Sequence, residues 1–190
     1  MVRAALFLMA FFLVGCGGNF SAPRNLDNAC ALANERPQYL RAMRATEREW
    51  GVPVHVQMAT IYQESRFIGN ARTPHRFALG VIPMGRQSSA FGYSQALDGT
   101  WEEYQRATRS FGARRQNIRD ATDFMGWYMT NSLERNGIPL HDARNQYLAY
   151  HEGNTGYARG SYNSKPWLIR IAGEVAARAQ MYQLQLASCR

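Results

Sequence analysis

The sequence predicts a single, mainly α-helical domain. Apolar residues recur at helical spacing in about six separate stretches, and glycine and proline punctuate the chain between them. Segments that alternate as a β-strand would are few. Hydrophobic residues make up 46% of the chain and charged residues 19%, a composition that suits a folded protein with a buried core. The length of 190 residues is typical of one domain.

The N-terminus predicts an exported protein with a lipid anchor. Arg3 precedes an apolar run, residues 4–14, which is too short to span a bilayer and is typical of a signal peptide. The run ends in L-V-G-C, which resembles a bacterial lipobox, so Cys16 would be acylated and become the mature N-terminus. The alternative is an ordinary signal peptide with an incidental cysteine. We expect a signal peptide over residues 1–15, a lipid anchor and tether over 16–30, and the folded domain over 31–190.

The cysteine count predicts one disulfide. The residue after Cys16 is Gly17 rather than an aspartate. In Gram-negative bacteria that resemble the enteric ones, this favours the periplasmic face of the outer membrane. That compartment is oxidising. With Cys16 lipidated, Cys30 and Cys189 remain, and we expect them to pair. The alternative is two unpaired thiols.

The charge balance is strongly basic. The net charge is +8 and is carried almost wholly by arginine, because Lys165 is the only lysine. Such a surface attracts polyanions, which include nucleic acid, anionic lipid and acidic cell-wall polymer. The sequence has no arginine run of the kind found in nucleic-acid-binding arms, and the charge alone does not choose among these partners.

The expected helices follow one another in short order. The first spans about residues 35–50, with Asn34 as its cap and Gly51 at its end, and the second begins at Pro53 and ends near Phe67. From residue 66 to residue 95 no helical period survives, although residues 77–84 suit a short strand or hairpin arm. Further helices are expected at about 100–108 with Thr100 and Glu103 as a capping box, at 117–136 ending at Gly137, from Asp142 to about 150, and from 166 to 186 capped by Ser164.

Glu64 is the candidate catalytic residue. It lies in the stretch I-Y-Q-E-S-R-F, residues 61–67, in the expected last turn of a largely buried helix that faces the long irregular loop. The negative end of the helix dipole and apolar neighbours both disfavour a carboxylate there, so they raise its pKa. A raised pKa is what a general acid needs near neutrality. The alternative is a surface glutamate that ends a helix.

Five segments in order resemble the catalytic domain of lytic transglycosylases of the soluble type, which belong to the goose-type-lysozyme-like superfamily. They are the Glu-Ser pair at 64–65, F-I-G-N-A-R-T at 67–73, A-F-G-Y-S-Q at 90–95, N-I-R-D-A at 117–121 and A-Y-H-E-G at 149–153. Each motif is weak alone, but five in the right order behind a lipobox are strong together, and the resemblance covers most of residues 51–177. The departures are a longer loop, with an insert at residues 75–89, Ser94 in place of a usual methionine, and His151-Glu152 in place of an Asn-Ala pair.

The resemblance implies a lysozyme-like fold with a long loop or small hairpin at the active-site cleft. It also implies that Glu64 alone cleaves the MurNAc-GlcNAc β-1,4 bond of peptidoglycan without water, as acid and then base, leaving 1,6-anhydro-MurNAc ends. Tyr150 would help to hold Glu64, and Thr73 would hydrogen-bond the N-acetyl group. Gln95 would lie beside the cleft or stabilise a turn. The remaining substrate-binding candidates are Tyr93, Ser94, His151 and Tyr157, with Tyr62 and Phe91 as further rings that could stack on sugars.

Two other functions stay open. If Glu152 lies across the cleft from Glu64, it could activate water, and the enzyme would be a hydrolytic muramidase. The chain could also be a non-catalytic glycan-binding lipoprotein. The four histidines show no ligand spacing and no nucleotide-binding loop occurs, so we expect no metal and no cofactor. The expected partners are peptidoglycan strands and, through the lipid, a membrane; we expect no nucleic acid and a monomer.

Overall fold

The computed structural model describes residues 20–78 and 81–189, so the expected signal peptide and Cys16 lie outside the described residues. The protein is mainly helical, as the sequence predicts. In order, the elements are α1 (Ala29–Glu35), α2 (Pro37–Trp50), α3 (Val54–Ser65), β1 (His75–Ala78), β2 (Ile82–Arg86), α4 (Asp98–Thr108), α5 (Ile118–Asn136), α6 (Ala143–Glu152), α7 (Asn154–Ala158), a 3₁₀ helix (Ser161–Ser164) and α8 (Pro166–Ser188).

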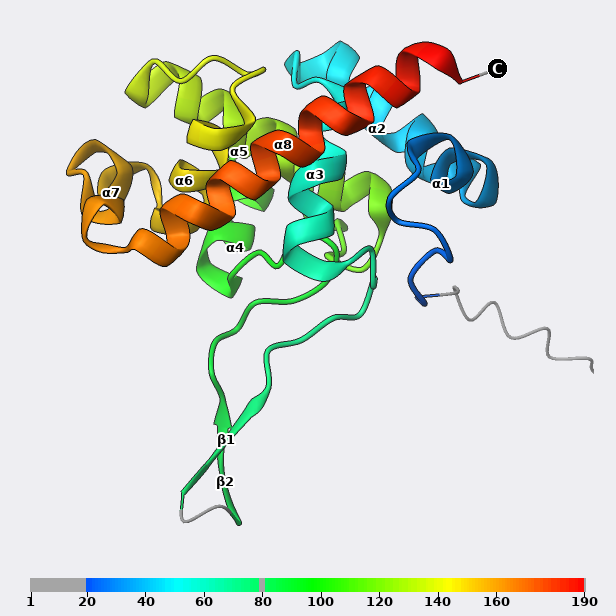
Figure 1. Ribbon diagram of the computed structural model, residues 1–190. Helices are drawn as coiled ribbons and strands as arrows, with labels where there is room; N and C mark the ends of the chain where they lie inside the picture. The colour runs from blue at the N-terminus through cyan, green and yellow to red at the C-terminus, as the bar shows by residue number, and fades with distance from the viewer. Residues whose placement is uncertain (1–19, 79–80, 190) are drawn as a thin grey trace, which may run out of the picture.

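Helix α8 organises the core. It crosses the molecule diagonally and packs on both α3 and α6, while α2 packs on α5 (Figure 1). Its apolar stripe, from Leu168 to Tyr182, is buried, and so is Met125 at the centre of α5. Two thirds of α3 is buried as well, and Glu64 in its last turn is half-buried. The catalytic candidate therefore sits on a helix that its neighbours hold on several sides. Within the described residues no helix has the length and apolar character needed to cross a bilayer.

Helix ends were predicted with mixed success. Asn117 caps α5 by accepting hydrogen bonds from the Arg119 and Asp120 amides, and the Asp142 side chain caps α6. Gly51 and Gly137 end α2 and α5 in the left-handed conformation. These four residues do what the sequence indicated.

Three predicted caps are wrong. Asn34 lies inside α1, so the position before α2 falls to Arg36, which gives no side-chain cap. Helix α4 begins at Asp98, with Leu97 at the cap position and no side-chain cap, so the cap lies three residues ahead of Thr100. Ser164 ends the 3₁₀ helix, and its hydroxyl donates to the Ser161 carbonyl, while the cap position of α8 falls to Lys165 without a side-chain cap.

The residues expected as a tether lie partly against the domain. The Leu26 carbonyl accepts a hydrogen bond from the Tyr182 hydroxyl at 2.5 Å, and Asp27 pairs with Arg178 at 2.8 Å. Helix α1, which starts inside the expected tether, is capped by Asn28.

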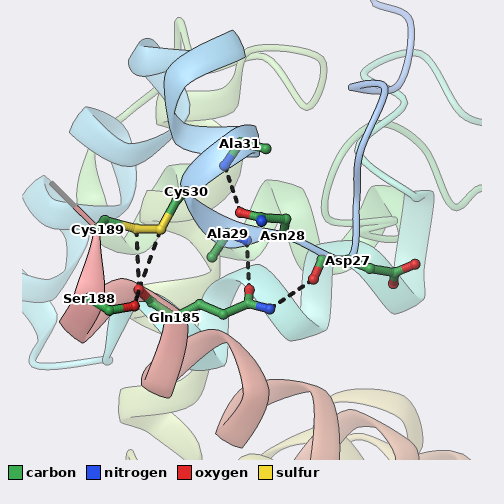
Figure 2. Close-up of a disulfide and its surroundings, with 8 residues drawn as sticks. All are labelled: Asp27, Asn28, Ala29, Cys30, Ala31, Gln185, Ser188 and Cys189. Carbon is green, nitrogen blue, oxygen red and sulfur yellow. Dashed lines mark hydrogen bonds between the residues drawn. A yellow bond between two sulfur atoms is a disulfide. The ribbon is translucent and has the colours of Figure 1, made fainter.

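The predicted disulfide between Cys30 and Cys189 is present and joins α1 to the end of α8 (Figure 2). Beside it, Gln185 accepts from the Ala29 amide at 2.7 Å and donates to the Asp27 carbonyl at 2.9 Å. The first and last helices are therefore held together by a covalent bond and a side-chain amide clamp.

The strand or hairpin arm expected over residues 77–84 is a two-stranded antiparallel hairpin. His75 faces Arg86 and Ala78 faces Ile82, with an irregularity between His75 and Phe77. Figure 1 shows the hairpin extending away from the helical body on two long arms, one from the end of α3 and one toward α4. An isolated hairpin is marginally stable in water, so this projection needs an explanation.

Candidate active site

Glu64 occupies the last turn of α3, as predicted. The helix ends at Ser65, and the next two residues, Arg66 and Phe67, both adopt positive φ angles of 52° and 61°. Non-glycine residues pay a steric penalty in this region, so surrounding structure must hold them there. Phe67 supplies that hold: it is fully buried, and its ring stacks on Tyr39 with centroids 5.8 Å apart. The sharp turn after Glu64 is thus fixed by a core contact.

Ser65 ties the helix end to the loop that follows the hairpin. Its hydroxyl lies 2.8 Å from the Tyr93 carbonyl and 3.2 Å from the Ile61 carbonyl, and its side chain is buried. The serine beside the glutamate therefore positions the turn and does not reach solvent.

The environment of Glu64 favours its protonated form. Burial raises its pKa to about 7, and a hydrogen bond from Tyr147 opposes this rise. The helix C-terminus adds partial negative charge at the same place. Glu64 is therefore close to half protonated at neutral pH, which allows one carboxyl to give a proton and later take one back.

Tyr147 is the hydroxyl partner of Glu64, and sequence reasoning missed it. Burial raises the pKa of Tyr147, and the Glu64 charge raises it further, so the phenol stays protonated and donates. The sequence assigned this role to Tyr150, three residues later on the same face of α6. Tyr150 instead donates to the Ser94 carbonyl at 2.6 Å, while it remains close enough to feel the Glu64 charge.

The loop at residues 90–96 is rigid and turns inward. Gly92 has φ +81°, and a Cβ there would lie 2.2 Å from the Arg115 carbonyl oxygen, so only glycine fits. Gln95 also has positive φ, and its side-chain amide donates to the Ala71 and Gly92 carbonyls at 3.0 and 2.8 Å. Gln95 was expected either to lie beside the cleft or to stabilise a turn, and these two hydrogen bonds give it the turn-stabilising role.

Three substrate-binding candidates are buried or bonded to other parts of the chain. Tyr93 is buried, and its hydroxyl meets that of Tyr39 at 2.8 Å. Ser94 is fully buried, and its hydroxyl has no hydrogen-bond partner among the described residues. The Thr73 hydroxyl donates a hydrogen bond to the Ser88 carbonyl at 2.9 Å and so joins the two arms of the hairpin loop. The tight turn at residues 90–96 rotates the first two side chains inward, a geometry that the motif pattern does not reveal.

A hollow of about 220 Å³ adjoins the Tyr150 ring. The start of α4, the middle of α5 and the end of α6 form its walls, with Gln95, Thr100, Tyr128 and His151 among the lining residues. Glu64 itself does not line it, and Tyr150 lies between the two. His151 is exposed at its edge and packs against the edge-on Trp167 ring, with centroids 5.3 Å apart.

Glu152 also lines this hollow, but it is locked in an ion pair. Both of its oxygens accept from the Lys165 ammonium, at 2.7 and 2.9 Å, and it also accepts from Ser161 and contacts His151. Burial works against the charged form, yet these hydrogen bonds outweigh it and hold the pKa of Glu152 at about 2. A carboxylate so fully engaged is a poor base for water.

Two further aromatic candidates are engaged elsewhere. Tyr157 is half-buried on α7, donates to the Asn145 side chain at 3.1 Å and stacks on Tyr162. Tyr62 lies between the guanidinium groups of Arg66 and Arg178, 3.8 and 3.3 Å from its ring centre. Tyr62, Arg66 and Arg178 line a separate, larger hollow of about 380 Å³ between α3 and α8. The described residues contain no cluster of three potential metal ligands.

Comparison with known proteins assigns the chain to a family. The family described as the transglycosylase SLT domain matches residues 4–189, which is nearly the whole chain. A comparison with curated proteins found no match.

Proposed function

Because the chain belongs to the transglycosylase SLT domain family and is a lytic transglycosylase of lysozyme-like fold that acts on peptidoglycan, we propose that Glu64 alone supplies its acid and base. The observation that carries the proposal is the contrast between two carboxyls. Glu64 has a pKa of about 7 and a tyrosine partner, whereas Glu152 has a pKa of about 2 and is saturated by Lys165 and Ser161.

The reaction proceeds in two proton transfers. Protonated Glu64 gives its proton to the bridging oxygen, and the bond from that oxygen to C1 of MurNAc breaks, with GlcNAc leaving as an alcohol. The positive charge at C1 is shared with the ring oxygen, and the N-acetyl group of the sugar assists. Glu64, now a carboxylate, takes the proton from the 6-hydroxyl of the same MurNAc, and that oxygen bonds to C1. The product carries a 1,6-anhydro ring, Glu64 is protonated again, and no water is consumed.

The tyrosines of α6 support both steps. Tyr147 donates to the Glu64 carboxylate formed between the two transfers and stabilises it. Tyr150 donates to the Ser94 carbonyl and so holds α6, which also carries Tyr147, against the loop at residues 90–96.

The muramidase reading is separated from this proposal by product analysis. Purified sacculi are digested, and the muropeptides are examined by mass spectrometry. We expect anhydro ends, which are lighter by one water than reducing ends. Glu64→Gln should abolish release of both products. Free reducing ends from the parent enzyme would contradict the proposal, and their loss in Glu152→Gln would assign the water-activating role to Glu152. Sacculi left intact by the parent enzyme would favour a glycan-binding lipoprotein.

We also propose that Cys16 is acylated and holds the enzyme at the periplasmic face of the outer membrane. The L-V-G-C sequence and the glycine after the cysteine support this. Labelled palmitate should enter the parent protein and be lost in Cys16→Ala; a parent protein that takes up no label contradicts the anchor.

A further inference from the structure

The hairpin loop has an unusual charge pattern. From Ser65 to Leu97 the sequence contains no aspartate or glutamate but four arginines, at positions 66, 72, 76 and 86. The strands themselves are mostly apolar between His75 and Arg86. The hairpin loop therefore carries positive charge where it leaves the helical body and apolar residues near its turn. Elements that lie at a membrane interface have this distribution of charge and hydrophobicity.

The far part of the hairpin leaves large apolar side chains in water. Val81, just before β2, is 76% exposed, and Met84 within β2 is 59% exposed. Figure 1 shows the hairpin standing clear of the helices, and its strands pack mainly on each other. An apolar pair held at the end of a long projection gains nothing from the fold of its own domain. It marks an interaction surface.

The start of the described chain lies at the base of the same projection. The Gly69 amide, in the arm between α3 and β1, donates to the Phe20 carbonyl at 3.1 Å. Phe20 follows Cys16 by four residues, a span of at most about 14 Å. An acyl chain on Cys16 would therefore bring a bilayer surface next to the arms that carry the hairpin.

We propose that the β1–β2 hairpin is a second membrane contact, which inserts Val81 and Met84 into an anionic leaflet while the arginines at its base face the lipid headgroups. The small C–H faces of glycan strands suit flat aromatic rings, whereas acyl chains take up aliphatic side chains such as Val81 and Met84. Each arginine near an anionic surface strengthens binding about fivefold. The inference draws on the proposed anchor but not on the chemistry of Glu64, so its failure would leave the catalytic proposal standing.

Leu184 provides a matched control. It is 75% exposed, nearly the same as Val81, but lies near the far end of α8. Val81→Cys and Leu184→Cys are made in the full chain, each with Cys16→Ser. Because Cys30 and Cys189 are joined in a disulfide, the introduced cysteine is then the free thiol in each variant. Each single thiol receives an environment-sensitive NBD probe, and vesicles are added that contain phosphatidylglycerol and acyl chains labelled with nitroxide. Both variants share one N-terminus, so any difference belongs to the labelled position.

The proposal predicts that NBD at position 81 brightens severalfold and is quenched by the nitroxide acyl chains, whereas NBD at position 184 does neither. Vesicles of phosphatidylcholine alone should give a weaker response. Equal quenching at the two positions overturns the proposal. It is likewise overturned if position 81 is shielded only by added sacculi, which would mean wall contact, or by raising the protein concentration, which would mean self-association.

A charge insertion gives a second test. Val81→Glu combined with Met84→Glu should weaken binding of the full chain to anionic vesicles about tenfold or more, while Leu184→Glu leaves it unchanged. Cleavage of short soluble glycan strands should be the same in all three proteins, because neither surface adjoins Glu64. Vesicle binding that is unaffected by the double substitution contradicts the insertion.

Discussion

Replacing Tyr147 by phenylalanine tests how Glu64 is tuned. The substitution removes the hydroxyl that lowers the pKa of Glu64 and leaves the burial that raises it. A hydrogen bond to a charged group contributes about 1.5–3 kcal/mol, and one pKa unit corresponds to about 1.4 kcal/mol. The pKa of Glu64 should therefore rise from about 7 by about one unit or somewhat more.

The sign of the effect on activity follows from the first proton transfer. Glu64 must be protonated in the free enzyme, so kcat/KM falls as pH rises through its pKa. In Tyr147→Phe this alkaline fall should move upward by about one pH unit. The maximal rate should drop by about tenfold to a hundredfold, because the carboxylate formed during the reaction loses its donor.

The assay is the initial rate of anhydro-muropeptide release across a pH series. Tyr39→Phe is the control, since its hydroxyl meets that of Tyr93 in the core, and the substitution should leave the alkaline fall in place. An alkaline fall in Tyr147→Phe that stays put or moves downward would refute the reasoning.

Three further predictions concern stability. Burial raises the pKa of Glu64 from 4.5 to about 7, so the folded state loses roughly 3 kcal/mol of stability as pH rises through this range. In urea unfolding, Glu64→Gln should therefore be more stable than the parent at pH 8, and this advantage should largely disappear at pH 4. Reduction of the Cys30–Cys189 bond should lower the free energy of unfolding by up to ~5 kcal/mol, and a smaller loss than ~1 kcal/mol in urea would show that the clamp of Gln185 suffices. Lys165→Met should destabilise the fold by about 2–3 kcal/mol at pH 7, allowing for the partly exposed lysine, and the deficit should shrink in acid titration as Glu152 protonates below pH 4.5; a deficit that does not depend on pH would mean lost packing rather than lost charge.

The sequence predicted what depends on local periodicity. The apolar stripe before Glu64 and the glycines after it were enough to place this residue at a helix end. The cap of α5 followed from Asn117 in the same way, and the hairpin from apolar residues that fit no helix.

What the sequence did not reveal depends on contacts between distant segments. Tyr147 and Tyr150 share one face of α6, and only the packing of α6 on α3 decides which hydroxyl meets Glu64. Ser94 turns inward because Gly92 fits under the Arg115 carbonyl, a contact between loops more than twenty residues apart. Likewise, the ion pair joins Glu152 at the end of α6 to Lys165 just before α8, beyond the motif that contains Glu152, so a comparison of motifs does not reveal it.

The covalent link between α1 and α8 has a mechanical consequence for an enzyme tied to one layer and working on another. A pull on the N-terminus can peel residues 20–29 from the surface, but it then meets Cys30 and passes along the disulfide into the 23-residue helix α8. Force applied through the tether would thus pass into α8, the longest of the described helices, and would bypass the turn that holds Glu64.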